Sequence, residues 1–241
     1  MKQVFYTVAA NRPLTADVWE MALTGDTSAI TAPGQFINIK LEGLYLRRPI
    51  SVCRWDETGL TILYKVVGRG TEAMTRLAPG AVLDTLSGLG NGYDVAACPD
   101  HVTVVGGGVG VPPLYGLTRA LIAAGKRVHA ILGFNTKSEI FYEEQFRALG
   151  AEVTVTTADG SYGTKGFVTA AMGPADAYVC ACGPEPMLKA VYGACADGQF
   201  SFEERMGCGF GACMGCSCET KYGSKRICKD GPVLRREEIV W

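Results

Sequence analysis

The chain has 241 residues, of which 48% are hydrophobic and 20% are charged, a composition typical of a globular protein. Its formal net charge of −1 gives no electrostatic basis for binding nucleic acid or an anionic membrane surface. No run approaches the roughly 20 apolar residues that a membrane-spanning helix needs. We therefore expect neither a nucleic-acid partner nor a membrane span.

The N-terminal segment and the cysteines indicate a cell compartment. Residues 1–8 lack the long apolar core and the small-residue cleavage site of a signal peptide. Ten cysteines in a chain without an export signal favour a reducing compartment, where clustered cysteines usually serve metal or redox chemistry. The sequence thus predicts a cytoplasmic protein.

Residues 1–98 predict a small antiparallel β-barrel. Apolar and polar residues alternate over 35–41 and over much of 59–67, as they do in half-buried strands. Turns rich in proline, glycine and aspartate separate these runs. A single helical turn is expected over 70–77, with Thr71 as its cap. Short strands at this spacing are typical of a barrel.

After residue 98 the pattern changes to alternating strands and helices. Strands are expected at 101–105, 127–132, 151–156 and 175–180, and helices at 111–124, 138–149 and 185–196. This alternation with short links predicts a parallel sheet covered on both faces. The predicted fold class is multi-domain β plus α/β: an antiparallel β-barrel at 1–98, a parallel-sheet α/β nucleotide-binding domain at 99–198, and a small C-terminal module at 199–241.

The C-terminal module carries a cysteine pattern with the spacing C-x4-C-x2-C-x11-C. Its members are Cys208, Cys213, Cys216 and Cys228. This is the spacing of plant-type [2Fe–2S] ferredoxins, so the four cysteines are the predicted iron ligands. Three interspersed glycines permit φ > 0 and let backbone N–H groups approach the sulfur atoms: Gly209, Gly211 and Gly215.

Two other interpretations of these cysteines stay open. Structural zinc prefers two C-x2-C pairs, and only Cys213 and Cys216 form such a pair. A set of disulfides would suit an oxidising compartment, which the rest of the chain does not favour. Cys218 is the fifth cysteine of the segment, and we expect it to be a bystander.

A glycine-rich turn follows the strand at 101–105. It contains Gly106, Gly107, Gly108 and Gly110, and then Pro113, which gives the pattern Gly-x-Gly-x-x-Pro. A strand, a glycine turn and a helix start bring backbone N–H groups to an anionic group, usually a pyrophosphate. The same pattern also occurs in structural turns, so the loop alone does not establish a nucleotide site.

Two short runs in the barrel region offer groups for a phosphate. Arg48-Pro49-Ile50-Ser51 carries a guanidinium and a hydroxyl, and Gly68-Arg69-Gly70-Thr71 lies at a helix start. Each run alone would equally suit an edge strand or a plain turn.

Taken in order with Cys182-Gly183-Pro184, these motifs resemble those of the ferredoxin–NADP reductase superfamily over roughly residues 1–198. The resemblance implies a FAD site at Arg48, Pro49, Ile50, Ser51, Leu63, Tyr64, Lys65, Gly70 and Thr71. It implies a NAD site at Gly106, Gly107, Gly108, Gly110, Pro113, Cys182 and Gly183. Ser51 and Cys182 would lie at the reacting rings as catalytic residues. Lys65 departs from the arginine often found at its place, so it would meet a phosphate as a point charge.

The C-terminal cysteines, with Cys228-x-Asp-Gly-Pro-Val, narrow the resemblance to the electron-transfer subunits of bacterial class 1B dihydroorotate dehydrogenases. This resemblance implies that electrons pass between NADH/NAD+, FAD and a [2Fe–2S] cluster. They would then reach an FMN-containing catalytic subunit that interconverts dihydroorotate and orotate in pyrimidine biosynthesis. The two subunits would form a heterotetramer with two copies of each.

Two alternatives remain for the function. The same cofactors occur in electron-transfer subunits of sulfide dehydrogenases, hydrogenases and ferredoxin:NADP oxidoreductases, so the partner stays open. A non-redox scaffold with a zinc-stabilised tail is the alternative from another class. For the nucleotide, Lys137 is the one basic residue over 134–144, where a 2′-phosphate would need a basic clamp, which favours NAD over NADP.

Overall fold

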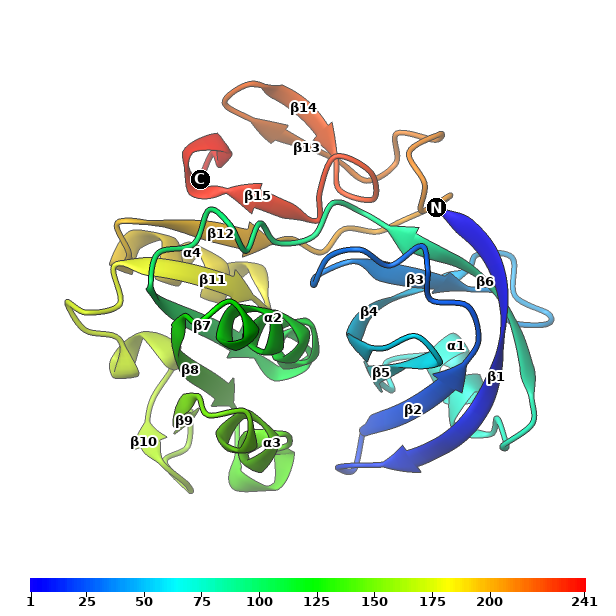
Figure 1. Ribbon diagram of the computed structural model, residues 1–241, viewed down its shortest axis with the longest axis horizontal. Coiled ribbons are helices and arrows are strands. Elements are labelled where there is room, and N and C mark those ends of the chain that lie inside the picture. The colour runs from blue at the N-terminus through cyan, green and yellow to red at the C-terminus, as the bar shows by residue number, and fades with distance from the viewer.

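The computed structural model describes residues 1–241 and places a β-barrel beside an α/β sheet, with the C-terminal segment packed over both (Figure 1). The predicted fold class is confirmed: an antiparallel barrel, a mainly parallel sheet with helices, and a small C-terminal region follow one another along the chain.

The barrel is closed, with six antiparallel strands in the order β1-β2-β5-β4-β3-β6. Their bounds are β1 Lys2–Pro13, β2 Val18–Thr24, β3 Phe36–Ile39, β4 Arg48–Trp55, β5 Gly59–Lys65 and β6 Val82–Leu89. Alternation puts Ile37 and Ile39 of β3 inside, where both are fully buried, and turns Asn38 outward. Asn38 is nevertheless only 1% exposed, so another part of the chain covers the outer face of β3.

Helix α1 (Arg69–Thr75) is fixed to the barrel by a short polar chain. The Tyr64 hydroxyl donates to Asn11 Oδ1 over 2.9 Å, and Asn11 Nδ2 donates to the Met74 carbonyl over 2.8 Å. The expectation that Thr71 caps this helix is wrong. Gly68 is the N-cap because the helix starts earlier, and the Thr71 hydroxyl instead accepts from the Val67 N–H over 2.9 Å.

The sheet has seven strands in the order β10-β9-β8-β7-β11-β12-β15. Their bounds are β7 His101–Gly107, β8 Arg127–Phe134, β9 Glu152–Thr157, β10 Thr164–Lys165, β11 Tyr178–Cys182, β12 Asp197–Ser201 and β15 Val233–Arg235. All neighbours are parallel except β15, which pairs antiparallel with β12. The carboxyl ends of the parallel strands therefore share one edge, where α/β proteins bind ligands.

Three helices cover the sheet: α2 Val111–Ala123, α3 Glu143–Ala148 and α4 Glu185–Ala194. The helix predicted over 138–149 is wrong in its first half. Tyr142 takes a left-handed φ of 66° ahead of α3, which a continuous helix cannot contain. Its ring packs edge-on against Tyr115 at 5.2 Å and near Phe141 at 6.3 Å, so tertiary aromatic packing outweighs helix propensity here.

The C-terminal segment is built onto the sheet. Strand β12 spans the predicted boundary at residue 199, and β15 extends the same sheet. The hairpin of β13 (Ser217–Thr220) and β14 (Gly223–Arg226) stands above it in Figure 1. The division into three domains stays a prediction.

Barrel and sheet share a core through α2. A Cβ on Gly116 would lie 2.7 Å from the Cys53 carbonyl oxygen, so this glycine lets α2 approach β4 closely. Leu63 of β5 belongs to the same buried cluster as Leu114 and Leu117 of α2. None of the helices has the length and apolar character that crossing a membrane requires.

Candidate functional site

The loop between β12 and β13 carries the first three predicted cluster ligands in tight turns. Gly209 and Gly211 have φ of 77° and 91°, in the region that strains any residue with a side chain. Gly215, which we expected to share this conformation, does not; Met214 adopts it instead, with φ of 59°. The Met214 carbonyl accepts hydrogen bonds from the Ser217 hydroxyl (2.8 Å) and N–H (3.2 Å), and this turn offsets the strain.

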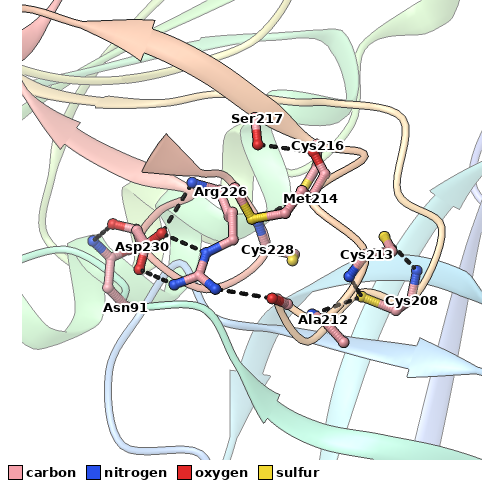
Figure 2. Close-up of polar contacts among 11 residues, drawn as sticks. Asn91, Cys208, Ala212, Cys213, Met214, Cys216, Ser217, Arg226, Cys228 and Asp230 are labelled. Atoms are coloured by element: carbon pink, nitrogen blue, oxygen red, sulfur yellow. Dashed lines mark hydrogen bonds and ion pairs between the residues drawn. The ribbon is translucent and has the colours of Figure 1, made fainter. Parts of the chain in front are cut away.

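The four predicted ligands lie in two pairs (Figure 2). The Cys208 N–H donates to Cys213 Sγ and the Cys213 N–H to Cys208 Sγ, each over 3.4 Å. The Cys228 N–H donates to Cys216 Sγ, also over 3.4 Å. Two pairs suit a binuclear cluster, in which each iron takes two thiolates. No three Cys, His, Asp or Glu side chains are placed to hold a single metal ion, as tetrahedral zinc would need.

The two pairs differ in exposure, and Cys208 and Cys228 differ in the pKa of their thiols. Cys213 is exposed, whereas Cys216 and Cys228 are buried. Burial opposes ionisation of Cys208, but hydrogen bonds from the N–H groups of Phe210 and Cys213 outweigh it and lower the pKa of its thiol to about 6. Burial, with Cys216 alongside, raises the pKa of the Cys228 thiol to about 12. Iron would meet a thiolate at Cys208 and displace a proton at Cys228.

A polar clamp formed by Asn91, Arg226 and Asp230 lies beside this loop and holds it (Figure 2). Arg226 Nη1 donates to the Gly211 carbonyl over 2.9 Å, and Arg226 Nε donates to Asp230 Oδ2 over 2.9 Å. Asn91, just after β6, donates to the Asp230 carbonyl (3.3 Å) and to the Val233 carbonyl (2.7 Å). The clamp therefore connects the end of the barrel to the cysteine loop.

The two motifs predicted for FAD meet in space. A Cβ on Gly70 would lie 2.7 Å from Arg48 Cζ, so the guanidinium of β4 fills the space that a side chain on α1 would need. Arg48 also donates to the Leu46 carbonyl, but it takes part in none of the ion pairs of the chain. A half-buried cation without a carboxylate partner fits a pyrophosphate.

The remaining residues predicted for FAD lie on β4 and β5. Pro49, Ile50 and Ser51 of β4 are half-buried and pair with β3. The Tyr64 ring is buried inside the barrel, so Tyr64 can meet a cofactor only through its main chain. Lys65 Nζ lies 3.0 Å from Asp17 Oδ2, so its charge is shared with a carboxylate.

The glycine loop and the Cys182-Gly183-Pro184 turn, also far apart in sequence, are in contact. A Cβ on Gly110 would lie 2.7 Å from the Gly183 nitrogen, and one on Gly107 would lie 3.2 Å from Pro184 Cδ. Gly108 differs, because its φ is 52° and no atom lies within 4 Å of its Cβ position. Open space in front of a glycine at the carboxyl edge of β7 fits a dinucleotide phosphate.

The last predicted residues of the nicotinamide site are buried. Gly106, at the end of β7, pairs with Cys182, at the end of β11, and Pro113 is buried in the first turn of α2. Burial and the nearby Glu203 raise the pKa of the Cys182 thiol to about 12. Cys182 is therefore a neutral thiol at physiological pH and not a nucleophile.

The sequence predictions missed three polar residues that hold the cysteine loop: Asn38, Arg226 and Asp230. Asn38 Nδ2 donates to the Cys208 carbonyl over 3.3 Å. In the sequence, Asn38 is the polar member of an alternating strand, a pattern that normally indicates solvent exposure. Only the Asp-Gly-Pro run after Cys228 gave a local signal, because such a run marks a tight turn.

Comparisons with known proteins agree with this geometry. Residues 203–240 match the iron–sulfur cluster binding domain of dihydroorotate dehydrogenase B, and residues 104–192 match the oxidoreductase NAD-binding domain. The chain is 42% identical to the dihydroorotate dehydrogenase B (NAD(+)) electron transfer subunit of Geobacillus sp. (strain WCH70), covering 100% of this chain and 99% of the relative. It is also 42% identical to the same subunit of Bacillus pumilus (strain SAFR-032), covering 99% and 98%.

A solved structure shares the whole architecture. An NADH-dependent reduced ferredoxin–NADP oxidoreductase, described for flavin-based electron bifurcation, superposes with a TM-score of 0.88 at 29% identity. The match covers 98% of this chain and 90% of that one. The similarity therefore includes the C-terminal region as well as barrel and sheet.

Fold, paired thiols and nucleotide loop together define an NAD-dependent iron–sulfur flavoprotein of the ferredoxin-reductase type, an oxidoreductase that uses FAD, NAD and a [2Fe–2S] cluster. The full-length identity to the relatives is more specific. The chain belongs to the family of electron transfer subunits of NAD-dependent dihydroorotate dehydrogenase B, and the predicted family, function and cofactors are confirmed.

Proposed function

We propose that this chain accepts hydride from NADH and delivers electrons to an FMN-containing catalytic subunit that interconverts dihydroorotate and orotate. When bound, FAD converts the hydride into single electrons, and the cluster carries them one at a time. The chain's own residues bind these groups, orient them and exclude water around them. Supporting this proposal, the relatives at 42% identity are named as electron transfer subunits of that enzyme.

We assign the binding residues by site. For FAD, we assign Arg48 to the pyrophosphate, which the main chain at Gly70 and Thr71 also approaches. The remaining residues assigned to FAD are Pro49, Ile50, Ser51, Leu63, Tyr64 and Lys65. For NAD, the residues are Gly106, Gly107, Gly108, Gly110, Pro113, Cys182 and Gly183. Ser51 and Cys182 lie at the reacting rings, Cys182 as a neutral thiol. The iron ligands are Cys208, Cys213, Cys216 and Cys228.

The exposure of the cysteine loop supports the proposed transfer of electrons from the cluster to the partner. Phe210 is 41% exposed and Met214 is 54% exposed, on either side of the exposed Cys213. We assign these two apolar side chains, exposed beside the cysteines, to the docking edge for the partner. Electrons would leave the chain at this edge of the loop.

The assembly we propose has two copies of each subunit, in the cytoplasm. None of the ten cysteines is paired in a disulfide, which agrees with a reducing compartment. Light scattering of the co-purified complex measures the stoichiometry directly. A one-to-one complex would contradict the heterotetramer without affecting the electron path.

The deciding experiment is an anaerobic purification of the tagged chain from its own cells, followed by an assay of NADH-dependent orotate reduction. We expect a co-purifying flavoprotein that contains FMN, and activity that requires both chains. The Cys213→Ser variant should retain NADH oxidation by ferricyanide through FAD but lose orotate reduction. A clean complex with no orotate reduction would overturn the assignment of the partner.

A second function is favoured by one observation. The solved structure at 29% identity is an NADH-dependent reduced ferredoxin–NADP oxidoreductase. If the purified complex lacks orotate reduction but couples NADH to ferredoxin and NADP, the chain serves that type of complex instead. The same purification therefore distinguishes the two partners.

A further inference from the structure

Asn38 of β3 connects the strand proposed for the flavin to the cysteine loop. It is the register partner of Pro49 on β4, within the run from Arg48 to Ser51. On its outer face, its Nδ2 donates to the carbonyl of Cys208 over 3.3 Å. One side chain thus lies between the FAD strand and the first cluster ligand.

The packing around Asn38 is specific to its amide group. A Cβ on Gly209 would collide with Asn38 Nδ2, so the glycine that follows Cys208 makes room for this amide. The main chain of Asn38 is held as well, because Arg47 Nη1 donates to its carbonyl over 3.3 Å and to the Asp84 carbonyl over 2.9 Å. Asn38 is therefore held in place on β3, and the cysteine loop packs against its side chain.

The burial of Asn38 argues for more than a space-filling role. Its side chain is 1% exposed, and Oδ1 has no donor among the protein's own groups. Burying an amide whose oxygen has no hydrogen bond costs about 1–3 kcal/mol, which an apolar side chain would avoid. The hydrogen bond from Nδ2 to the Cys208 carbonyl is therefore the reason for an amide at this position.

We propose that Asn38 is a positioning residue for electron transfer: it holds Cys208 against β4 and thereby fixes the separation between flavin and cluster. This inference rests on the proposed placement of FAD along β4. Asn38 contacts a ligand residue and not the reacting atoms, so its effect should appear in the step between the two cofactors and not in hydride transfer.

The test compares Asn38→Ala and Asn38→Asp with the native chain. Asn38→Asp keeps the shape but places an acceptor against the Cys208 carbonyl, which removes the hydrogen bond without opening a cavity. For both variants we expect unchanged FAD content and unchanged NADH oxidation by ferricyanide. The rate at which NADH reduces the cluster, followed by stopped-flow absorbance, should fall, because electron transfer slows when the separation between flavin and cluster is no longer fixed. The electron paramagnetic resonance spectrum of the reduced cluster should change as well.

Two further variants complete the design. Gln199→Ala is the matched control, because Gln199 is also a buried amide whose Nε2 donates to a distant carbonyl, that of Asp94, away from the cysteine loop. Gly209→Ala disturbs the same contact from the cysteine loop, because its added Cβ collides with Asn38. As a single substitution it should slow the reduction of the cluster. Combined with Asn38→Ala it should be less harmful than the sum of the two, because the smaller residue removes the collision.

Three results would overturn the proposal. Native rates and a native resonance spectrum in both Asn38 variants would mean that the link has no role. Loss of FAD in these variants would make Asn38 a flavin-binding residue instead. Equal slowing in Gln199→Ala would show that any buried amide has the same effect. Failure of orotate reduction in the native complex leaves these readouts unchanged, so the two proposals fail separately.

Discussion

The guanidinium of Arg48 occupies the position that a side chain at Gly70 would take, with Arg48 Cζ 2.7 Å from the Cβ position. A strand of the barrel and the start of α1 are thereby joined into one surface. This contact explains why the two short motifs occur together although each is uninformative alone.

Gly70→Ala should therefore weaken FAD binding. The added Cβ must push Arg48 aside, and we expect the dissociation constant for FAD to rise at least about tenfold, since a misplaced charge-assisted contact costs about 1.5–3 kcal/mol. Fluorescence titration of the FAD-free protein measures this constant. The barrel should remain folded, because Arg48 and Gly70 lie outside its interior cluster.

Gly68→Ala is the control for this prediction. Gly68 is extended, with φ of 173°, and no atom lies within 4 Å of its Cβ position. Alanine fits there without a collision, so FAD affinity should stay within about twofold, as a change of a few tenths of a kcal/mol at an N-cap implies. If both variants bind FAD equally well, the Arg48–Gly70 contact is not part of the flavin site.

The sequence alone was sufficient where function depends on spacing along the chain. The cysteine pattern, with Cys208 and Cys213 close in sequence, predicted ligands that the fold brings into pairs. Strand–helix alternation likewise predicted the sheet, because each element is long enough for its own periodicity to be read. These signals are local, so no knowledge of packing was needed.

The sequence was insufficient where a residue's role depends on what packs against it. Asn38 looks like a solvent-facing strand residue until the cysteine loop covers it. Lys65 looks like a free phosphate ligand, but Asp17 of another turn shares its charge. Tyr142 breaks a helical pattern because its ring packs against Tyr115. In each case tertiary contacts outweigh the local preference.

Cys213→Ser should abolish the cluster, and Cys218→Ser should preserve it. Cys213 is half of the first thiol pair, whereas Cys218 lies on β13, where it pairs with Lys225 of β14. Serine is a poor ligand for iron, so iron and acid-labile sulfide should be lost only in the first variant. Elemental analysis and electron paramagnetic resonance measure both. A lost signal in Cys218→Ser would show that the ligand assignment is wrong.

Arg226→Lys should loosen the cluster loop without affecting the flavin. Lysine cannot reproduce the fork that bonds Asp230 and the Gly211 carbonyl at once. We expect iron to be removed by a chelator about tenfold faster, the effect of losing roughly 1.4 kcal/mol of charge-assisted hydrogen bonding. FAD content and ferricyanide reduction should not change.

Arg235→Lys is the matched control for the clamp. Arg235 also pairs with an aspartate, Asp94, but over 3.3 Å between side chains that are 58% and 47% exposed. Exposed pairs of this kind contribute little to stability. Chelation rates as fast in Arg235→Lys as in Arg226→Lys would mean that the clamp has no special role.

Asp176→Asn should destabilise the folded chain and remove part of its acid sensitivity. Asp176 is buried and accepts hydrogen bonds from the Thr103 hydroxyl (2.5 Å), the Gly173 N–H (2.7 Å) and the His129 ring (3.0 Å). Burial opposes ionisation, but the bonds from Thr103 and Gly173 outweigh it, so the pKa of the Asp176 carboxyl is lowered. An amide would direct N–H groups at one of these donors, at a cost of about 1–3 kcal/mol.

The sign of the pH dependence follows from that lowered pKa. A carboxyl whose pKa is lower in the folded chain stabilises it fully above the unfolded value, about 3.9, and the contribution disappears as pH falls through the folded value. The difference in unfolding free energy between native chain and Asp176→Asn should thus be present at about pH 5 and shrink below about 4. Urea unfolding followed by circular dichroism measures this difference.

Asp159→Asn is the control: Asp159 is an exposed aspartate hydrogen-bonded to Ser161, and its substitution should give a much smaller difference. A difference for Asp176→Asn that stays unchanged down to pH 3 would contradict the assigned role of this carboxylate.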